Sequence, residues 1–135
     1  MRRTFVVTMW KATVSAAVVL ALGMAVARAV GPLDGRTFKV ESGEKGKAKA
    51  EDDEISFAAG AFHSKACDPY GFESGPYKTT AKDGVTTFEA ETSSAKEGRI
   101  RWKGTVKGDR IEGTYVWTKA GQADIEYWFK GQATK

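Results

Sequence analysis

The chain has 135 residues and a formal net charge of +4, from 21 Lys and Arg residues against 17 Asp and Glu residues. Four of the basic residues, Arg2, Arg3, Lys11 and Arg28, lie within the first 29 residues, which contain no acidic residue. The remaining 106 residues therefore carry 17 charges of each sign. Such a neutral surface lacks the concentrated positive field that binds phosphate backbones, which argues against a nucleic-acid partner. A chain of this length forms one small domain.

The first 29 residues have the organisation of a cleavable signal peptide. A basic segment precedes an apolar run over residues 12–27, and Ala27-Arg28-Ala29 has the small residues typical of a signal-peptidase site. The apolar run is shorter than the roughly 20 residues that span a bilayer, which favours cleavage after Ala29 over a permanent membrane anchor. Arg2-Arg3 also resembles the twin-arginine export motif, so two export routes stay open. We expect a periplasmic or secreted bacterial protein with one domain over residues 30–135.

The rest of the chain alternates apolar and polar side chains in short stretches separated by Gly, Asp, Ser and Lys, which is typical of antiparallel strands. Residues 42–54 have cancelling basic and acidic blocks and are predicted to be largely a solvated connector. Eight sequential strands leave two exposed edges unless the sheet closes. We therefore predict an all-β fold, an antiparallel up-and-down meander that closes into a small barrel. The predicted strands lie near residues 36–42, 53–58, 61–66, 75–82, 85–93, 99–107, 110–118 and 124–131.

A tight turn over residues 107–110 sets the register of the sixth and seventh predicted strands. It places Gly104 opposite Gly113 and Trp102 opposite Tyr115. Glycine within a strand permits sharp curvature, or leaves room for a ring from across the interior. Continuing the same phase through the neighbouring strands directs six aromatic side chains inward, those of Phe88, Trp102, Tyr115, Trp117, Tyr127 and Phe129.

Charged side chains occupy the opposite, outer face. A turn at residues 83–84 places Lys78 opposite Glu89, and the loop over residues 94–97 places Glu89 opposite Lys103. Opposite charges on adjacent strands contribute roughly 0.2 to 1 kcal/mol a pair. Because a shift by one residue would exchange the two faces of a strand, the agreement of several hairpins supports this register.

The predicted meander resembles the calycin type of secreted barrel, the group that includes lipocalins, fatty-acid-binding proteins and avidins. The resemblance lies in residues 33–38, Leu-Asp-Gly-Arg-Thr-Phe, which open the first strand, and in the hairpin over residues 108–115. It implies a lipocalin-like barrel. Lipocalins usually open with Gly-x-Trp, whereas Gly35 is followed by Phe38 in third place, so no ligand-binding residue is carried over from these families. Residues 62–72 also resemble segments of small exported bacterial proteins, a likeness that implies no activity.

The segment from His63 to Tyr77 contains the only His and the only Cys of the chain. Since a single cysteine cannot form an internal disulfide, Cys67 is predicted to be a small buried side chain, with an intermolecular disulfide, a nucleophile and a metal ligand as alternatives. Strand parity directs Phe62 inward and His63 outward beside Ser56, which argues against a Cys–His nucleophilic pair. A zinc site would need three or four ligands from this one loop, so no metal or cofactor is predicted. The candidate loop residues are His63, Cys67, Asp68, Tyr70 and Tyr77.

Two functions follow from these features. The inward aromatic set predicts a non-catalytic barrel that binds a small apolar or aromatic ligand in its interior. An eight-stranded barrel either fills with side chains or holds one small ligand, and this many rings slightly favours filling. The alternative is a protein-binding module, such as an inhibitor of an exported hydrolase, that uses the loop from Cys67 to Tyr77. No catalytic residue is predicted, and an enzyme that uses Cys67 is the third hypothesis.

Overall fold

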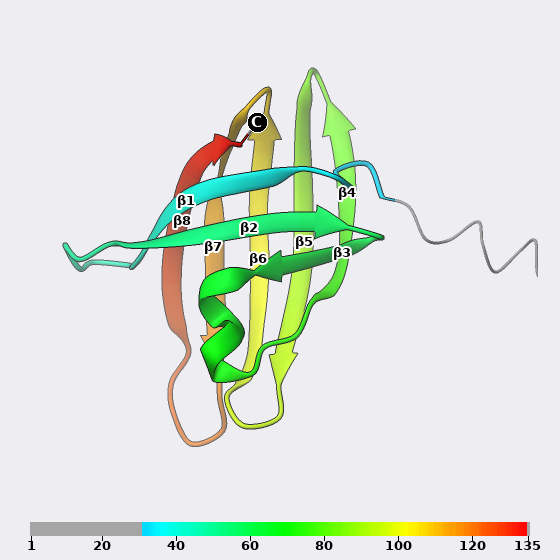
Figure 1. The fold of residues 1–135 in the computed structure, drawn as a ribbon. Helices are drawn as coiled ribbons and strands as arrows, with labels where there is room; N and C mark the ends of the chain where they lie inside the picture. The colour runs from blue at the N-terminus through cyan, green and yellow to red at the C-terminus, as the bar shows by residue number, and fades with distance from the viewer. Residues whose placement is uncertain (1–30, 135) are drawn as a thin grey trace, which may run out of the picture. The chain divides into compact units, whose positions relative to one another are not determined.

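The computed structural model describes residues 31–134, and the predicted leader and its cleavage site lie outside them. Each strand in this part of the chain pairs with the next, and the first pairs with the last, which closes a barrel. The predicted all-β meander is therefore confirmed (Figure 1). The elements in chain order are β1 (Thr37–Glu44), β2 (Glu51–Ala58), β3 (Ala61–Ser64), the 3-10 helix η2 (Lys65–Tyr70), β4 (Gly75–Lys82), β5 (Val85–Ser94), β6 (Gly98–Lys107), β7 (Arg110–Thr118) and β8 (Ile125–Ala133).

The predicted register of β4 to β8 is also confirmed. On the inner face Gly104 pairs with Gly113. On the outer face Glu89 lies between Lys78 and Lys103, as the hairpin turns predict. Local turn residues and a period of two are thus sufficient to align these five strands.

The paired glycines leave room for rings of the interior. A Cβ atom at Gly104 would lie 2.8 Å from Phe88 Cε1, and a Cβ atom at Gly113 would lie 2.7 Å from Phe129 Cζ. Both rings are buried. The absence of side chains at these two positions therefore lets large rings approach the sheet backbone closely.

Aromatic rings fill the barrel between its two ends. The ring centroid of Phe57 lies 5.2 Å from that of Phe88 and 5.5 Å from that of Phe62. The centroid of Trp102 lies 4.7 Å from that of Phe62 and 5.8 Å from that of Phe129. These separations are those of rings in direct contact. Packed side chains therefore occupy this part of the interior.

Different segments cover the two ends of the barrel. Leu33, in the turn before β1, is buried at the end where the β4–β5 and β6–β7 turns lie, and the neighbouring Arg36 side chain donates to the backbone oxygen of Gly108. Phe72, which follows η2, is buried at the other end, beside the β5–β6 loop. We call these the Leu33 end and the η2 end; the β4–β5 and β6–β7 turns of the first are at the top of Figure 1, and the β5–β6 loop of the second is at the bottom.

The predicted length of the third strand was wrong. β3 ends at Ser64 rather than at residue 66, and the chain turns directly into η2. The carboxylate of Asp53 accepts a hydrogen bond of 2.8 Å from the backbone N–H of Ala66, which stabilises the turn. Other strand boundaries differ from the prediction by one or two residues. No helix in residues 31–134 has the length and apolar character needed to cross a membrane.

Candidate functional site

Hydrogen bonds hold residues 65–74, here called the η2 loop, against β2 and β5. At its start, the carboxylate of Asp53 on β2 accepts a hydrogen bond from the backbone N–H of Ala66. At its centre, Ser94 Oγ of β5 donates to the backbone oxygen of Tyr70 at 2.8 Å. Near its end, the N–H of Glu73 donates to a backbone oxygen of β5 at 3.1 Å. The loop is irregular, yet its backbone conformation is fixed at three points.

His63 connects two parts of this loop. Its Nε2 lies 2.9 Å from Asp68 Oδ1, and its Nδ1 lies 3.1 Å from Ser74 Oγ. Ser74, His63 and Asp68 thus form a Ser–His–Asp series. Acyl transfer by such a series would also need N–H groups that face the developing oxyanion. The N–H of Glu73 instead donates to β5, and Gly75 is paired with β3. The contacts of His63 join the start and the end of the η2 loop to β3.

Cys67 lies on the inner side of η2, and its polar neighbour is Ser64 rather than His63. Sγ lies 3.3 Å from Ser64 Oγ, which in turn donates to Asp53 Oδ2 at 2.6 Å. The Ser64 hydroxyl has a single proton, so the Asp53 carboxylate and Cys67 Sγ are both acceptors of that one donor.

The surroundings of the Cys67 thiol keep it protonated. Burial raises the pKa of Cys67, and the negative charges of Asp53 and Asp68 raise it further, against an opposing contribution from Ser64. A thiol with a raised pKa is a weak nucleophile at neutral pH. Cys67 is therefore a partly buried thiol rather than the fully buried side chain that the sequence predicts.

Tyr70 points away from the barrel. The residue is 61% exposed, and no other large hydrophobic residue among residues 31–134 is exposed. It follows Pro69 and precedes Gly71, which ends η2 in the left-handed conformation with φ of 81°. An apolar ring is thus displayed to solvent from a segment whose backbone is ordered.

Tyr77 lies at the Leu33 end, away from the η2 loop with which the sequence prediction grouped it. Its hydroxyl donates to Asp34 Oδ1 at 2.7 Å and accepts from the backbone N–H of Leu33 at 3.0 Å. Burial and the hydrogen bond to Asp34 raise the pKa of Tyr77 to about 12. Backbone N–H donors, above all that of Gly31, lower the pKa of Asp34.

The six predicted inward aromatic residues divide into two groups. Tyr115, Trp117 and Tyr127 lie toward the η2 end and are partly exposed. The rings of Tyr115 and Tyr127 stack at 4.7 Å with an angle of 7° between their planes. The Tyr115 hydroxyl hydrogen-bonds to Ser42, Trp117 Nε1 donates to the backbone oxygen of Glu97 at 2.6 Å, and burial raises the pKa of Tyr115. The other group is buried in the packed interior: Phe88, Trp102 and Phe129.

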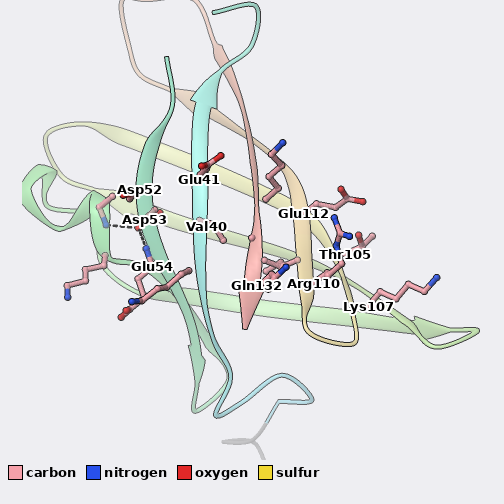
Figure 2. Close-up of a pocket in the computed structure, with 16 residues that line it drawn as sticks. Val40, Glu41, Asp52, Asp53, Glu54, Thr105, Lys107, Arg110, Glu112 and Gln132 are labelled. Atoms are coloured by element: carbon pink, nitrogen blue, oxygen red, sulfur yellow. Dashed lines mark hydrogen bonds between the residues drawn. The ribbon is translucent and has the colours of Figure 1, made fainter. Parts of the chain in front are cut away.

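A groove of about 1200 Å³ lies on the outer surface of the barrel, over β1, β2 and β6 to β8 (Figure 2). Glu41, Asp52 and Glu54 lie on its β1–β2 side, and Lys107 and Arg110 lie on its β6–β7 side. The residues that line the groove include five acidic and five basic ones. It therefore has no field of one sign that would select phosphate or another simple anion.

Sequence reasoning missed the polar side chains that hold the η2 loop. The role of Asp53 could have been inferred from the sequence, because Asp53 shares the inward phase of Ile55 and Phe57 on β2. An inward carboxylate requires a hydrogen-bond partner. The remaining ones have no signal in the sequence, since their contacts depend on how the loop folds back onto the barrel: Ser64, Ser74 and Ser94.

Within residues 31–134, no three His, Cys, Asp or Glu side chains are arranged to hold a metal ion. Comparison of the chain with protein-family models, with curated proteins and with solved structures gives no match.

Proposed function

We propose that this protein is an exported, calycin-like barrel without catalytic activity that binds another protein through the η2 loop. The exposure of Tyr70 carries this proposal. Aromatic side chains supply much of the binding energy at protein interfaces when a partner buries them. Because hydrogen bonds to β2 and β5 already order the loop, association would cost little further backbone entropy.

The predicted signal peptide supports a partner outside the cytoplasm. An exported hydrolase is the partner class we propose, since an ordered loop with an aromatic tip is suited to entering an active-site cleft. The predicted mature chain has equal numbers of acidic and basic residues, so long-range electrostatic steering would contribute little to association. Affinity would then depend on contacts of the loop itself.

Replacement of Tyr70 tests the proposal. Binding and inhibition are measured against a panel of purified exported glycosidases and proteases. For a hydrolase that binds, Tyr70→Ala should weaken affinity roughly 30-fold, the loss of about 2 kcal/mol expected of an interface anchor. Tyr70→Phe, which keeps the ring, and Lys96→Ala on the neighbouring exposed loop are the matched controls and should bind nearly as the wild type does. Equal affinity of Tyr70→Ala and the wild type would show that the η2 loop is not part of the binding site.

The partly exposed Tyr115–Tyr127 stack favours a second candidate, the binding of a small apolar or aromatic ligand. A flat ring could extend this stack beside Trp117 at the η2 end, whereas the centre of the barrel is occupied by packed rings. Titration with aromatic dyes and lipids should then change Trp fluorescence in the wild type and change it much less in Tyr127→Ala. An unchanged spectrum across the whole ligand panel counts against this candidate.

A further inference from the structure

β3 and β4 pair over a short length only. Two residue pairs, 61–76 and 62–75, connect these strands, and the N–H of Tyr77 donates to the backbone oxygen of Gly60 at 3.3 Å. Beyond this point β4 continues over residues 78–82, which pair with β5 and with no other strand in the described part of the chain. In Figure 1 this part of the β4–β5 hairpin extends past β1 to β3 at the Leu33 end.

The register shows which backbone groups face this open edge. In an antiparallel strand, the N–H and C=O groups of successive residues point alternately to the two sides. The N–H of Tyr77 points toward β3, so the backbone groups of Thr79 and Ala81 point to the same side. Lys82 pairs with Val85 across the two-residue turn, so the backbone groups of Lys82 point toward β5. This direction agrees with the alternation. Thr79 and Ala81 therefore present N–H and C=O groups that no described strand pairs.

The side chains along the edge carry positive charge. Residues 78–82 contain Lys78 and Lys82 and no acidic residue. Lys82 takes part in none of the ion pairs among residues 31–134, and the 3.6 Å pair between Lys78 and Glu89 is solvent-exposed and therefore weak. The opposite face of the edge carries the small side chains of Thr79 and Ala81.

This charge pattern disfavours a second copy of the chain as the occupant. Antiparallel pairing of two β4 edges about Thr80 would place Lys78 of each chain against Lys82 of the other. Like charges directly opposite each other destabilise paired strands, and lysine on an edge strand opposes self-association for this reason.

We infer that the open edge of β4 accepts an extended segment of another protein that alternates acidic and apolar residues. The segment adds a strand to the sheet by bonding to the backbone groups of Thr79 and Ala81. Its acidic side chains lie beside Lys78 and Lys82, and its apolar side chains cover the small residues on the other face. This edge is at the opposite end of the barrel from η2, the element that ends at Tyr70, so the inference does not depend on the proposed function of the η2 loop (Figure 1).

The probe is a capped hexapeptide of three Glu-Val repeats, titrated into the isotope-labelled protein and followed by NMR. The amide signals of Thr79 and Ala81 should shift and gain protection from hydrogen exchange, whereas the amide of Thr80, which points to β5, should already be protected. Raising the salt concentration should weaken binding, because the lysines are exposed. A peptide with N-methyl groups on the amides that face β4 should not bind.

One double variant tests the charge contribution, and a pair of variants at Thr79 tests the backbone contribution. The exposed double substitution Lys78→Glu with Lys82→Glu should weaken binding of the Glu-Val peptide roughly tenfold or more and should allow a Lys-Val peptide to bind. Thr79→Pro, which lacks the edge N–H, should lose binding, whereas Thr79→Val should keep it.

Three outcomes would overturn the inference. Peptide-induced shifts confined to residues outside β4 would place binding elsewhere. Unchanged affinity after charge reversal would contradict the acidic partner. Shifts of the Thr79 and Ala81 amides with protein concentration alone would assign the edge to self-association.

Discussion

The hydroxyl of Tyr77 on β4 donates a 2.7 Å hydrogen bond to Asp34 in the turn before β1. The same carboxylate accepts the backbone N–H groups of Gly31 at 2.7 Å and of Gly60 at 3.1 Å. One side chain therefore joins the turn before β1, the β2–β3 turn and β4 at the Leu33 end. Donors of this kind bind the ionised carboxylate more strongly than the protonated one.

Asp34 should make folding stability fall in acid. Its hydrogen bonds, chiefly from the Gly31 N–H, lower its pKa in the folded protein below the ordinary value of 3.8. A group with a lowered folded pKa stabilises the fold above its unfolded pKa, and this stabilisation is lost as the pH falls through the folded pKa. Asp34→Asn should therefore be less stable than the wild type at neutral pH, with a smaller further loss below about pH 4. Urea unfolding across this range measures both quantities.

The control for this measurement is Asp124→Asn, which alters an exposed carboxyl in the β7–β8 loop. Its acid dependence should follow that of the wild type. The same acid dependence in Asp34→Asn as in the wild type would contradict the assignment.

Alkylation of Cys67 by iodoacetamide should be slow in the native protein. Burial raises the pKa of this thiol, so the thiolate that reacts is scarce at neutral pH. The rate should rise in alkaline buffer and rise further in denaturant, and mass spectrometry of quenched samples reports both changes. A native rate equal to that of a free thiol would argue for an accessible, activated cysteine instead.

Gly113→Ala should strongly destabilise the barrel. The added Cβ would meet the backbone oxygen of Lys103 and the ring of Phe129, and backbone on the paired strand cannot move aside as a flexible side chain can. Overpacking of this kind costs about 1–3 kcal/mol and occasionally more. Thr114→Ala, which removes an exposed side chain on the next residue of β7, should change the unfolding free energy by less than about 0.5 kcal/mol. Similar denaturation midpoints for the two variants would contradict this packing.

The buried pair of Trp102 and Thr92 should show energetic coupling. Trp102 Nε1 donates to Thr92 Oγ1 at 3.1 Å, and both side chains are buried. Trp102→Phe leaves the hydroxyl without this donor, at a cost of about 1–3 kcal/mol in addition to the lost packing. Combining it with Thr92→Val should recover part of that loss, and a double-mutant cycle of unfolding free energies measures the coupling. Strict additivity of the two substitutions would show that the hydrogen bond contributes little.

The sequence alone determined the strands, the order in which they pair and the face on which each side chain lies. These properties are local, because alternation has a period of two and turns such as Asp83-Gly84 connect neighbouring segments. The pairing of Gly104 with Gly113 follows from the turn that joins their strands. For the same reason, the inward direction of the six aromatic residues could be predicted without knowing what they contact.

Only the tertiary structure decided which of these residues act together. Tyr77 is close in sequence to the η2 loop, yet its hydroxyl binds Asp34, 43 residues away, because closure of the sheet brings β4 beside the turn before β1. The contacts of Tyr70 with β5 and the open edge of β4 likewise depend on where strands distant in sequence begin and end around the barrel. Alternation specifies the face of a side chain, but only the closed sheet specifies its neighbours.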